Sequence, residues 1–173
     1  EDPYQLRRKL LADKPRHLKV LDLAAEKAGW GEPIAEGKGR GISLQESFGS
    51  LVAQVVDVTL AGGKIGVDRV VCAIDAGSAV SPDGLTALME SGIIYGLSAA
   101  MYGEVSVENG AVQQTAFHDY PVTRMADSPV IETYILDSGE AMGGAGEPGT
   151  PGIAPALANA IYQATGTRVR KLP

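Results

Sequence analysis

Apolar residues recur with a helical period at the start of the chain. Asp2-Pro3 and Pro15 are favourable helix starts, because the amide hydrogen that proline lacks would have no partner in a first turn. The pattern predicts a short helix to Leu11 and a second helix from Pro15 to Ala28, with Gly29 as its stop. The pair should pack on the rest of the chain through one apolar face, formed by Leu18, Leu21, Ala25 and Ala28.

The middle of the chain changes to a strand pattern. Residues 50–60 alternate and are rich in β-branched side chains, residues 61–64 are typical of a hairpin turn, and residues 65–74 form the returning strand. The glycine-rich segment 37–41 predicts a flexible entry to another strand rather than a phosphate loop, since no helix follows it. Cys72 lies inside the second strand pattern, so we expect a small core residue and not a nucleophile.

A third helix is predicted for residues 84–103. Its apolar positions have helical spacing, and Gly92, Gly96 and Ala100 give it one smooth face. Such a face allows either close packing of the helix on a sheet or close approach of a cofactor.

Asn109-Gly110 is the strongest short hairpin signal in the chain, and strands are predicted on both sides of it, at 104–108 and 111–115. The run His118-Asp119-Tyr120 that follows invites a catalytic interpretation. Adjacent residues of an extended segment point to opposite faces, however, so a structural hydrogen-bond role is favoured.

Together these elements predict an α+β fold, with a helical N-terminal pair, antiparallel strands joined by hairpins, and helices packed on them. Hairpins rather than repeated strand–helix–strand units support this class. The chain is expected to divide near residues 36–39. The first part, 1–37, would be a helical hairpin segment and the second, 38–173, an α+β domain.

The segment most suited to chemistry reads GGAGEPGTPG over residues 143–152. Its glycines lack a Cβ, so the chain can adopt positive φ angles there and a ligand can lie against bare amides. Thr150 is a good N-cap and Pro151 a good first residue for a helix that should stop at Gly166. Glu147, the only carboxylate of the segment, would lie just outside that helix N-terminus, where negative charge is favourable.

Three interpretations of this loop compete. Gly144, Gly146 and Gly149 fit the G-x-G-x-x-G dinucleotide fingerprint, which requires a strand directly before it and a strand–helix–strand unit around it. Here a polar stretch, 137–140, precedes the loop, and too few residues follow it for a helix, a second strand and an acidic ribose contact. A surface turn with a solvated glutamate and a catalytic carboxylate beside a cofactor both remain open.

Several motifs occur in order along the chain, and the most specific is its end. They are Gly39-Arg40-Gly41, Phe48-Gly49-Ser50, Asp75-Ala76-Gly77, and the segments 89–97, 117–121, 143–161 and 165–173. With these motifs the chain, from Asp2 to Pro173, resembles the C-terminal part of the large subunit of molybdenum hydroxylases, the xanthine dehydrogenase and aldehyde oxidase family. Within that family it resembles the branch of isoquinoline 1-oxidoreductase beta subunits.

The resemblance implies a molybdopterin-binding domain and a role for each loop residue. Glu147 would be the general base beside the molybdenum. Gly144, Ala145, Gly146 and Gly149 would lie against a molybdopterin cofactor in its cytosine dinucleotide form. The reaction would be hydroxylation of a carbon next to nitrogen in a heteroaromatic ring, or of an aldehyde carbon. Electrons would leave through an iron-sulfur small subunit or a cytochrome subunit.

Two positions depart from the family pattern. Ser81 stands before Pro82 where the family has asparagine, and Leu88 replaces a glutamine that contacts the molybdopterin. Leucine can neither donate nor accept a hydrogen bond, so one expected cofactor contact is missing. Ser81 and Leu88 favour an alternative function, a non-catalytic scaffold or interaction domain that kept the fold and lost the cofactor. Glu147 in its glycine loop favours the enzyme.

The length of the chain also limits what it could do alone. It has 173 residues and starts at Glu1, whereas the family's large subunits are several times longer. We therefore expect a C-terminal piece of a larger catalytic subunit, whose remainder would supply the other walls of the active site. This piece alone is expected to be inactive and to hold no cofactor.

Composition narrows the classes of partner. A net charge of −6 and an aromatic content of 5% argue against nucleic-acid binding, which needs clustered Lys and Arg and stacking side chains. His17 and His118 are the only histidines, so no metal site made of protein ligands is expected. No apolar stretch is long enough to cross a membrane. The sequence leaves the compartment open between cytoplasm and periplasm.

Overall fold

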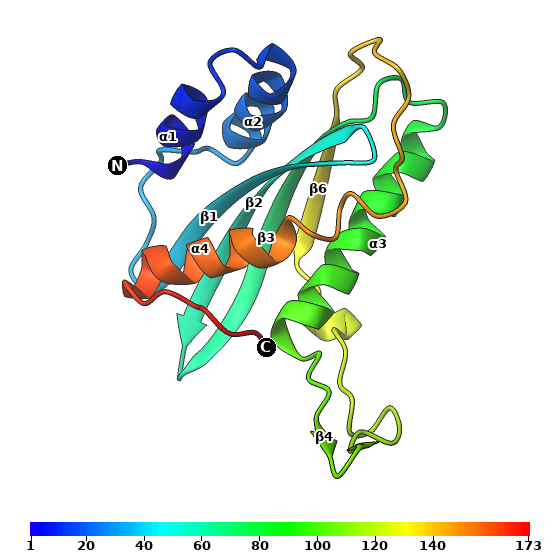
Figure 1. Cartoon of the computed structure of the whole chain (residues 1–173). Helices are drawn as coiled ribbons and strands as arrows, with labels where there is room; N and C mark the ends of the chain where they lie inside the picture. The colour runs from blue at the N-terminus through cyan, green and yellow to red at the C-terminus, as the bar shows by residue number, and fades with distance from the viewer.

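A computed structural model describes all 173 residues, and a four-stranded mixed sheet forms its centre (Figure 1). β1 (Lys38–Ser47), β2 (Ser50–Ala61) and β3 (Lys64–Asp75) are antiparallel neighbours, and β6 (Val130–Ile135) pairs in parallel with β3. The helix α3 (Pro82–Met101) lies in the connection between β3 and β6. The α+β class is confirmed. The sequence predicted antiparallel strands only and did not predict the parallel pairing of β6 with β3. These two strands lie far apart in the sequence, so no turn signal links them.

Helices cover both faces of this sheet (Figure 1). α2 (Pro15–Lys27) packs on one face, with α1 (Pro3–Leu10) beside it. α3 and α4 (Ile153–Thr165) pack on the other face. Because successive strand residues point to opposite faces, Val55 lies in the α2 layer and Val56 in the α3 and α4 layer.

The predicted apolar face of α2 is confirmed for Leu21, Ala25 and Ala28, which are buried, while Leu18 is only partly buried. This helix shares its core with the strands that follow residue 37, and the domain boundary near that residue stays a prediction. Cys72 is a fully buried core residue, as expected, and burial raises the pKa of its thiol to about 12.

The start of α4 differs from the sequence expectation. The helix begins at Ile153 with Gly152 as its N-cap, and the Thr150 side chain caps nothing. Instead the Thr150 amide donates to the Glu147 carbonyl at 2.9 Å, and the chain continues in turns through Gly152. The predicted stop is confirmed, since Gly166 has a φ of 72°.

Residues 103–129, here called the arm, project away from the sheet (Figure 1). The Asn109-Gly110 turn is confirmed, with φ angles of 51° and 80°, but β4 (Val107–Glu108) and β5 (Ala111–Val112) are shorter than predicted. Asp119 has the expected structural role, because its carboxylate accepts hydrogen bonds from the amides of Thr115 and Ala116. None of the helices combines the length and the apolar character that crossing a membrane requires.

Two glycines of β1 let α4 lie directly on the sheet. A Cβ at Gly41 would collide with the Ala156 carbonyl and the Ala160 amide, and one at Gly39 with the Ala160 carbonyl. Of the segment predicted as a flexible strand entry, residues 38–41 belong to the strand itself, and Gly39 and Gly41 allow close packing, while Gly37 lies in the turn before it. This contact fixes the start of α4 and hence the end of the loop that precedes it.

We predict that Gly41→Ala lowers the free energy of unfolding by about 1–3 kcal/mol, because the methyl group has no space between β1 and α4. The matched control is Gly66→Ala, which also lies in a strand but whose Cβ would meet only the Thr59 carbonyl, at 3.8 Å. Urea unfolding of the two variants measures the difference. Equal shifts of the unfolding midpoint would show that α4 adjusts freely.

Candidate cofactor-binding site

The glycine loop, residues 143–149, is anchored at its start by main-chain hydrogen bonds. The Gly143 amide donates to the Ala76 carbonyl at 3.0 Å, and the Gly144 amide donates to the Phe48 carbonyl at 2.8 Å. The Ser50 hydroxyl donates back to the Gly144 carbonyl at 2.7 Å. The loop is therefore tied to the β1–β2 turn and to the end of β3.

Two glutamine side chains anchor the other end of the loop. Gln45 Nε2 donates to the Pro148 carbonyl, and Gln54 Nε2 donates to the Gly149 carbonyl at 2.7 Å. Gln54 is fully buried, so this second bond lies in the core beneath the loop. A loop built without regular structure is thus held in place by side chains from β1 and β2.

Most of the loop glycines allow the loop to lie close to neighbouring segments, and none of them has an unusual backbone angle. None of them has a positive φ angle, so the conformational freedom that glycine allows is not used here. A Cβ added at Gly143 would lie 2.7 Å from the Gly49 carbonyl carbon, and one added at Gly144 would lie 2.8 Å from the Phe48 Cβ. One added at Gly149 would lie 3.0 Å from the Met89 carbonyl oxygen. Gly146 differs from the others, since nothing lies within 4 Å of its Cβ position.

The centre of the loop presents hydrogen-bond donors that the chain itself does not use. The amides of Ala145, Gly146 and Glu147 donate to no acceptor in the protein. The Glu147 side chain is exposed and its carboxylate has no hydrogen-bond or ion-pair partner. Three consecutive amides are therefore available as hydrogen-bond donors to a ligand.

An apolar groove of about 560 Å³ lies between the loop and the start of α3. Gly143 and Ala145 line it from the loop side, and Ser81 and Leu88 line it from the α3 side. Ser81 is the N-cap of α3, and its hydroxyl accepts a hydrogen bond from the Gly84 amide at 3.3 Å. Both positions that depart from the family pattern therefore face the same groove.

The structure brings the predicted site residues together as one short loop, with differences in exposure. Ala145 lines the groove, Gly146 and Glu147 are exposed beside it, and Gly149 is buried against Met89. The small residues Gly92 and Gly96 of α3 face the end of this loop and the start of α4 rather than the sheet. A Cβ at Gly92 would lie 3.2 Å from Gly149 Cα, and one at Gly96 would collide with Ile153.

Sequence reasoning missed a buried carboxylate beside the loop. Asp75 ends β3, and its carboxylate accepts hydrogen bonds from Arg16 Nε at 2.8 Å, Arg16 Nη2 at 3.0 Å, the Gly77 amide at 2.8 Å and the Ser138 hydroxyl at 2.7 Å. Burial alone would raise the pKa of this carboxyl, but the donors outweigh burial and the pKa lies below its ordinary value. The Asp75-Ala76-Gly77 motif was the available signal for this residue.

A carboxylate whose pKa is lowered by folding stabilises the protein above its unfolded pKa, and that contribution is lost as the pH falls through the folded value. We predict that Asp75→Asn reduces the loss of stability between neutral pH and pH values below about 4, the ordinary pKa of aspartate. Thermal unfolding measured across this range checks the effect. An unchanged pH dependence would show that Asp75 titrates alike in the folded and unfolded chains.

Free main-chain donors, an open glycine position and an adjoining apolar groove give this α+β chain a candidate ligand-binding site. The sequence profile of the molybdopterin cofactor-binding domain matches residues 18–129. The chain belongs to the molybdenum hydroxylase family.

Known relatives cover nearly all of the chain. It is 36% identical to the beta subunit of isoquinoline 1-oxidoreductase from Brevundimonas diminuta, over 99% of this chain and 23% of that protein. It is 33% identical to a subunit of nicotinate dehydrogenase from Pseudomonas putida, over 99% of this chain and 16% of that protein. The chain therefore spans less than a quarter of the length of these two relatives.

The fold also agrees with a solved structure. Quinoline 2-oxidoreductase from Pseudomonas putida 86 superposes with a TM-score of 0.60 at 20% identity, over 68% of this chain and 16% of that one. The likeness shows that the arrangement of sheet and helices is shared.

The residues present fit a molybdopterin cofactor. The free amides of residues 145–147 suit an oxygen-rich anionic group, and the unfilled Cβ position of Gly146 leaves room for a ligand to lie against the backbone. The groove beside them adds apolar contact from Leu88 and Ala145.

Proposed function

We propose that this chain supplies the cofactor loop and the catalytic base of a molybdenum-dependent oxidoreductase. The reaction is hydroxylation of a carbon in an N-heteroaromatic ring or of an aldehyde carbon. The observation that carries the proposal is Glu147, an exposed carboxylate without a partner, on an anchored loop beside three unused amides. The names of the relatives, isoquinoline 1-oxidoreductase and nicotinate dehydrogenase, support the heteroaromatic class of substrate.

Glu147 acts by taking up a proton at one carboxylate oxygen. The bound molybdenum cofactor supplies the oxygen-transfer and electron-transfer chemistry, so the protein has to provide only binding, orientation and proton transfer. The anchors at Gly143, Gly144 and Gly149 hold the loop on both sides of Glu147. This placement reduces the freedom of the backbone that carries the base, which favours a reproducible distance to the substrate.

The cofactor is a molybdopterin, in its cytosine dinucleotide form, and it contacts Gly144, Ala145, Gly146 and Gly149. The fold leaves the Cβ position of Gly146 open, so a bound cofactor would have room to lie against the backbone there. The groove and loop are open to solvent, and this chain corresponds to only 23% of the length of its isoquinoline 1-oxidoreductase relative. The remaining length of the large subunit supplies the missing walls, and the 173-residue chain alone is inactive and holds no cofactor.

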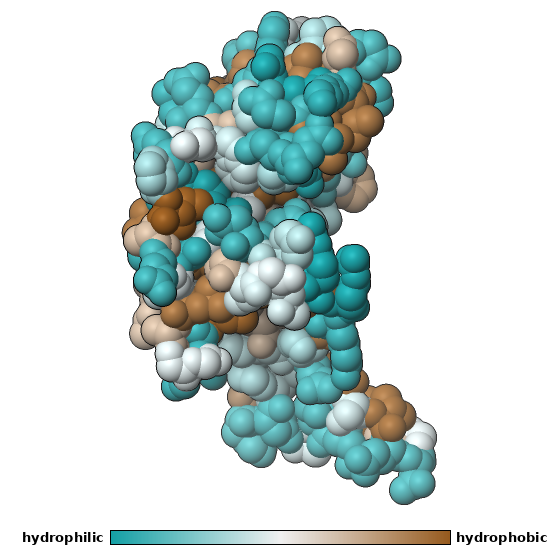
Figure 2. Space-filling model, turned by 90° about the vertical axis from the view of Figure 1, so that its left-hand side faces the viewer, coloured by the Kyte–Doolittle hydropathy of each residue, from teal (hydrophilic) through white to brown (hydrophobic).

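Other chains accept the electrons. The partner is an iron-sulfur small subunit or a cytochrome subunit, and the subunit designations of the relatives support a multi-subunit enzyme. The arm supports further contacts within such an assembly, because it contains no buried residue and exposes large apolar side chains (Figure 2). These include Val105, Val107, Val112, Phe117 and Met125.

A non-catalytic scaffold or interaction domain is the second candidate. Leu88 and Ser81 favour it, because both face the groove and leucine offers no hydrogen bond to a cofactor. The two functions differ in one measurable property, which is the molybdenum content of the full-length subunit.

We predict that the full-length subunit, produced with its partners in a host that makes molybdopterin, contains molybdenum by mass spectrometry. Glu147→Gln should abolish turnover while the molybdenum content stays at the wild-type value, because the amide cannot take up a proton. Glu140→Gln is the matched control, since Glu140 is another exposed acid shortly before the loop, and it should retain activity. Absence of molybdenum would establish the scaffold, and an active Glu147→Gln enzyme would remove Glu147 from the role of base.

A second substitution tests the contact at Gly146. Gly146→Ala should not lower the free energy of unfolding and should raise it by about 0.4–1 kcal/mol, because its Cβ position is open and its φ is not positive. The molybdenum content should nevertheless fall, because the methyl group occupies space that the cofactor needs. Gly144→Ala provides the contrast, since it collides with Phe48 and should lower stability as well. Wild-type molybdenum content in Gly146→Ala would contradict the contact.

A further inference from the structure

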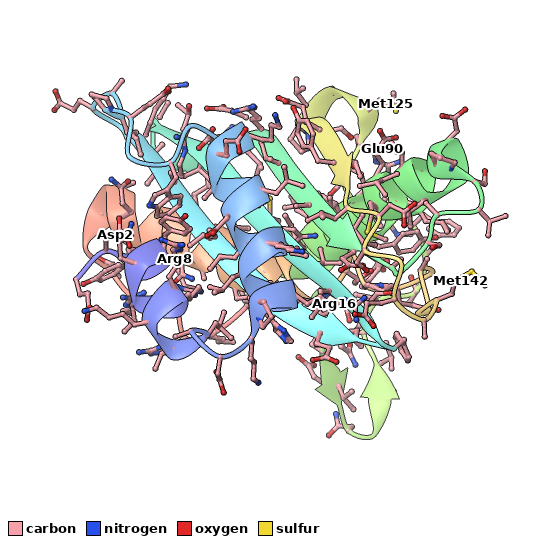
Figure 3. All side chains as sticks on the ribbon, turned by 90° about the horizontal axis from the view of Figure 1, so that it is seen from above. Asp2, Arg8, Arg16, Glu90, Met125 and Met142 are labelled. Carbon is pink, nitrogen blue, oxygen red and sulfur yellow. The ribbon has the colours of Figure 1, made fainter.

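Arg16 joins α2 to two turns at one end of the sheet (Figure 3). Its Nε and Nη2 donate to the two carboxylate oxygens of Asp75 at 2.8 and 3.0 Å, a planar two-point contact. Its Nη2 also donates to the Asp75 carbonyl, and its Nη1 donates to the Gly49 carbonyl, both at 3.2 Å. One side chain therefore fixes the end of β3 and the β1–β2 turn relative to α2.

Both of these turns hold the glycine loop. The carbonyl of Phe48, next to Gly49, accepts the Gly144 amide, and the carbonyl of Ala76, next to Asp75, accepts the Gly143 amide. These are the anchors at the start of the loop, directly before its free amides. A shift of either turn would move the loop with it.

The turn after β3 also fixes the segment that leads into the loop. Gly77 has a φ of 83°, and a Cβ there would lie 2.5 Å from the Ala141 carbonyl oxygen and 2.6 Å from the Glu140 carbonyl oxygen. The Ser138 hydroxyl donates to Asp75, and the Ser138 amide donates to the Gly77 carbonyl at 3.1 Å. The chain before the loop is thus packed on the same turn that Arg16 holds through Asp75.

We propose that Arg16 is a positioning residue for Glu147. It holds the turns 47–50 and 75–77, and these turns hold the glycine loop that carries Glu147. The proposal rests on the function of Glu147 as the catalytic base. Arg16 makes no hydrogen bond to residues 143–149 and does not line the groove, so its influence passes through the two turns. Reacting groups tolerate little displacement, and a shift of about 1 Å lowers rates on the order of a hundredfold.

Arg40 offers a matched comparison. Its Nε and Nη2 donate to the two carboxylate oxygens of Asp57 at 2.6 and 2.9 Å, and its Nη1 donates to the Gly29 carbonyl at 2.7 Å. It therefore makes the same type of contact, a paired carboxylate and a main-chain carbonyl, but makes none to the turns that hold the loop. A substitution at Arg40 reproduces the loss of a partly buried ion pair without the loss of the loop anchor.

The test uses Arg16→Lys and Arg40→Lys in the full-length, cofactor-loaded enzyme. Lysine keeps the charge but cannot make the two-point contact. Arg16→Lys should raise hydrogen–deuterium exchange several-fold in the peptide that covers residues 143–149. It should also lower kcat about tenfold to a hundredfold at unchanged molybdenum content. Arg40→Lys should leave loop exchange and kcat at their wild-type values, while thermal unfolding shows a similar loss of stability for both variants.

Each alternative result has a defined meaning. Equal loop exchange in the two variants would overturn the proposal, and so would raised loop exchange in Arg16→Lys with wild-type kcat. Asp75→Asn provides a second route to the same test if Arg16→Lys does not fold, because it removes the charge that pairs with Arg16. Glu147→Gln in the same preparation separates the role of Glu147 as base from the anchoring of the loop by Arg16. If this variant retained activity, the role of Glu147 as base would be refuted, whereas the anchoring of the loop would not.

Discussion

Hydrogen bonds between the backbone of the glycine loop and the ends of three strands are the interaction on which the site depends. A loop that crosses the end of a sheet has no ladder to satisfy its main-chain groups, so other partners must do so. Ser50 and Gln54 supply side-chain donors, and Phe48 and Ala76 supply carbonyl acceptors. With these groups satisfied, the amides of 145–147, which are exposed or partly exposed residues, still have no acceptor within the chain.

Local signals predicted much of the fold, and contacts distant in sequence account for what they missed. The helix starts at Pro3 and Pro15 and the Asn109-Gly110 turn depend on a few neighbouring residues, and all were found. The β1–β2 turn was missed because Phe48 has a positive φ of 54°, an angle that its residue type does not suggest. The parallel pairing of β6 with β3 was missed because it carries no local signal.

The candidate site divides in the same way. The loop and Glu147 were found because glycine spacing and a lone carboxylate are visible in consecutive residues. Arg16 and Gln54 were not found, because each acts on a group far along the chain, and a polar residue inside a strand or helix pattern gives no indication of such a partner. The spacing of residues predicts where chemistry is concentrated, whereas the residues that hold it in place depend on the tertiary structure.

The groove changes the meaning of the two departures from the family pattern. Leu88 offers no side-chain hydrogen bond to the groove, but the free amides of 145–147 belong to the backbone and do not depend on side-chain identity. Gly146 weighs against the scaffold, because glycine costs about 0.4–1 kcal/mol of stability relative to alanine where alanine fits without strain. No contact within the chain requires glycine at this position, and its φ is not positive. The proposed contact with a cofactor would account for this glycine, whereas a scaffold without a cofactor offers no such reason within this chain.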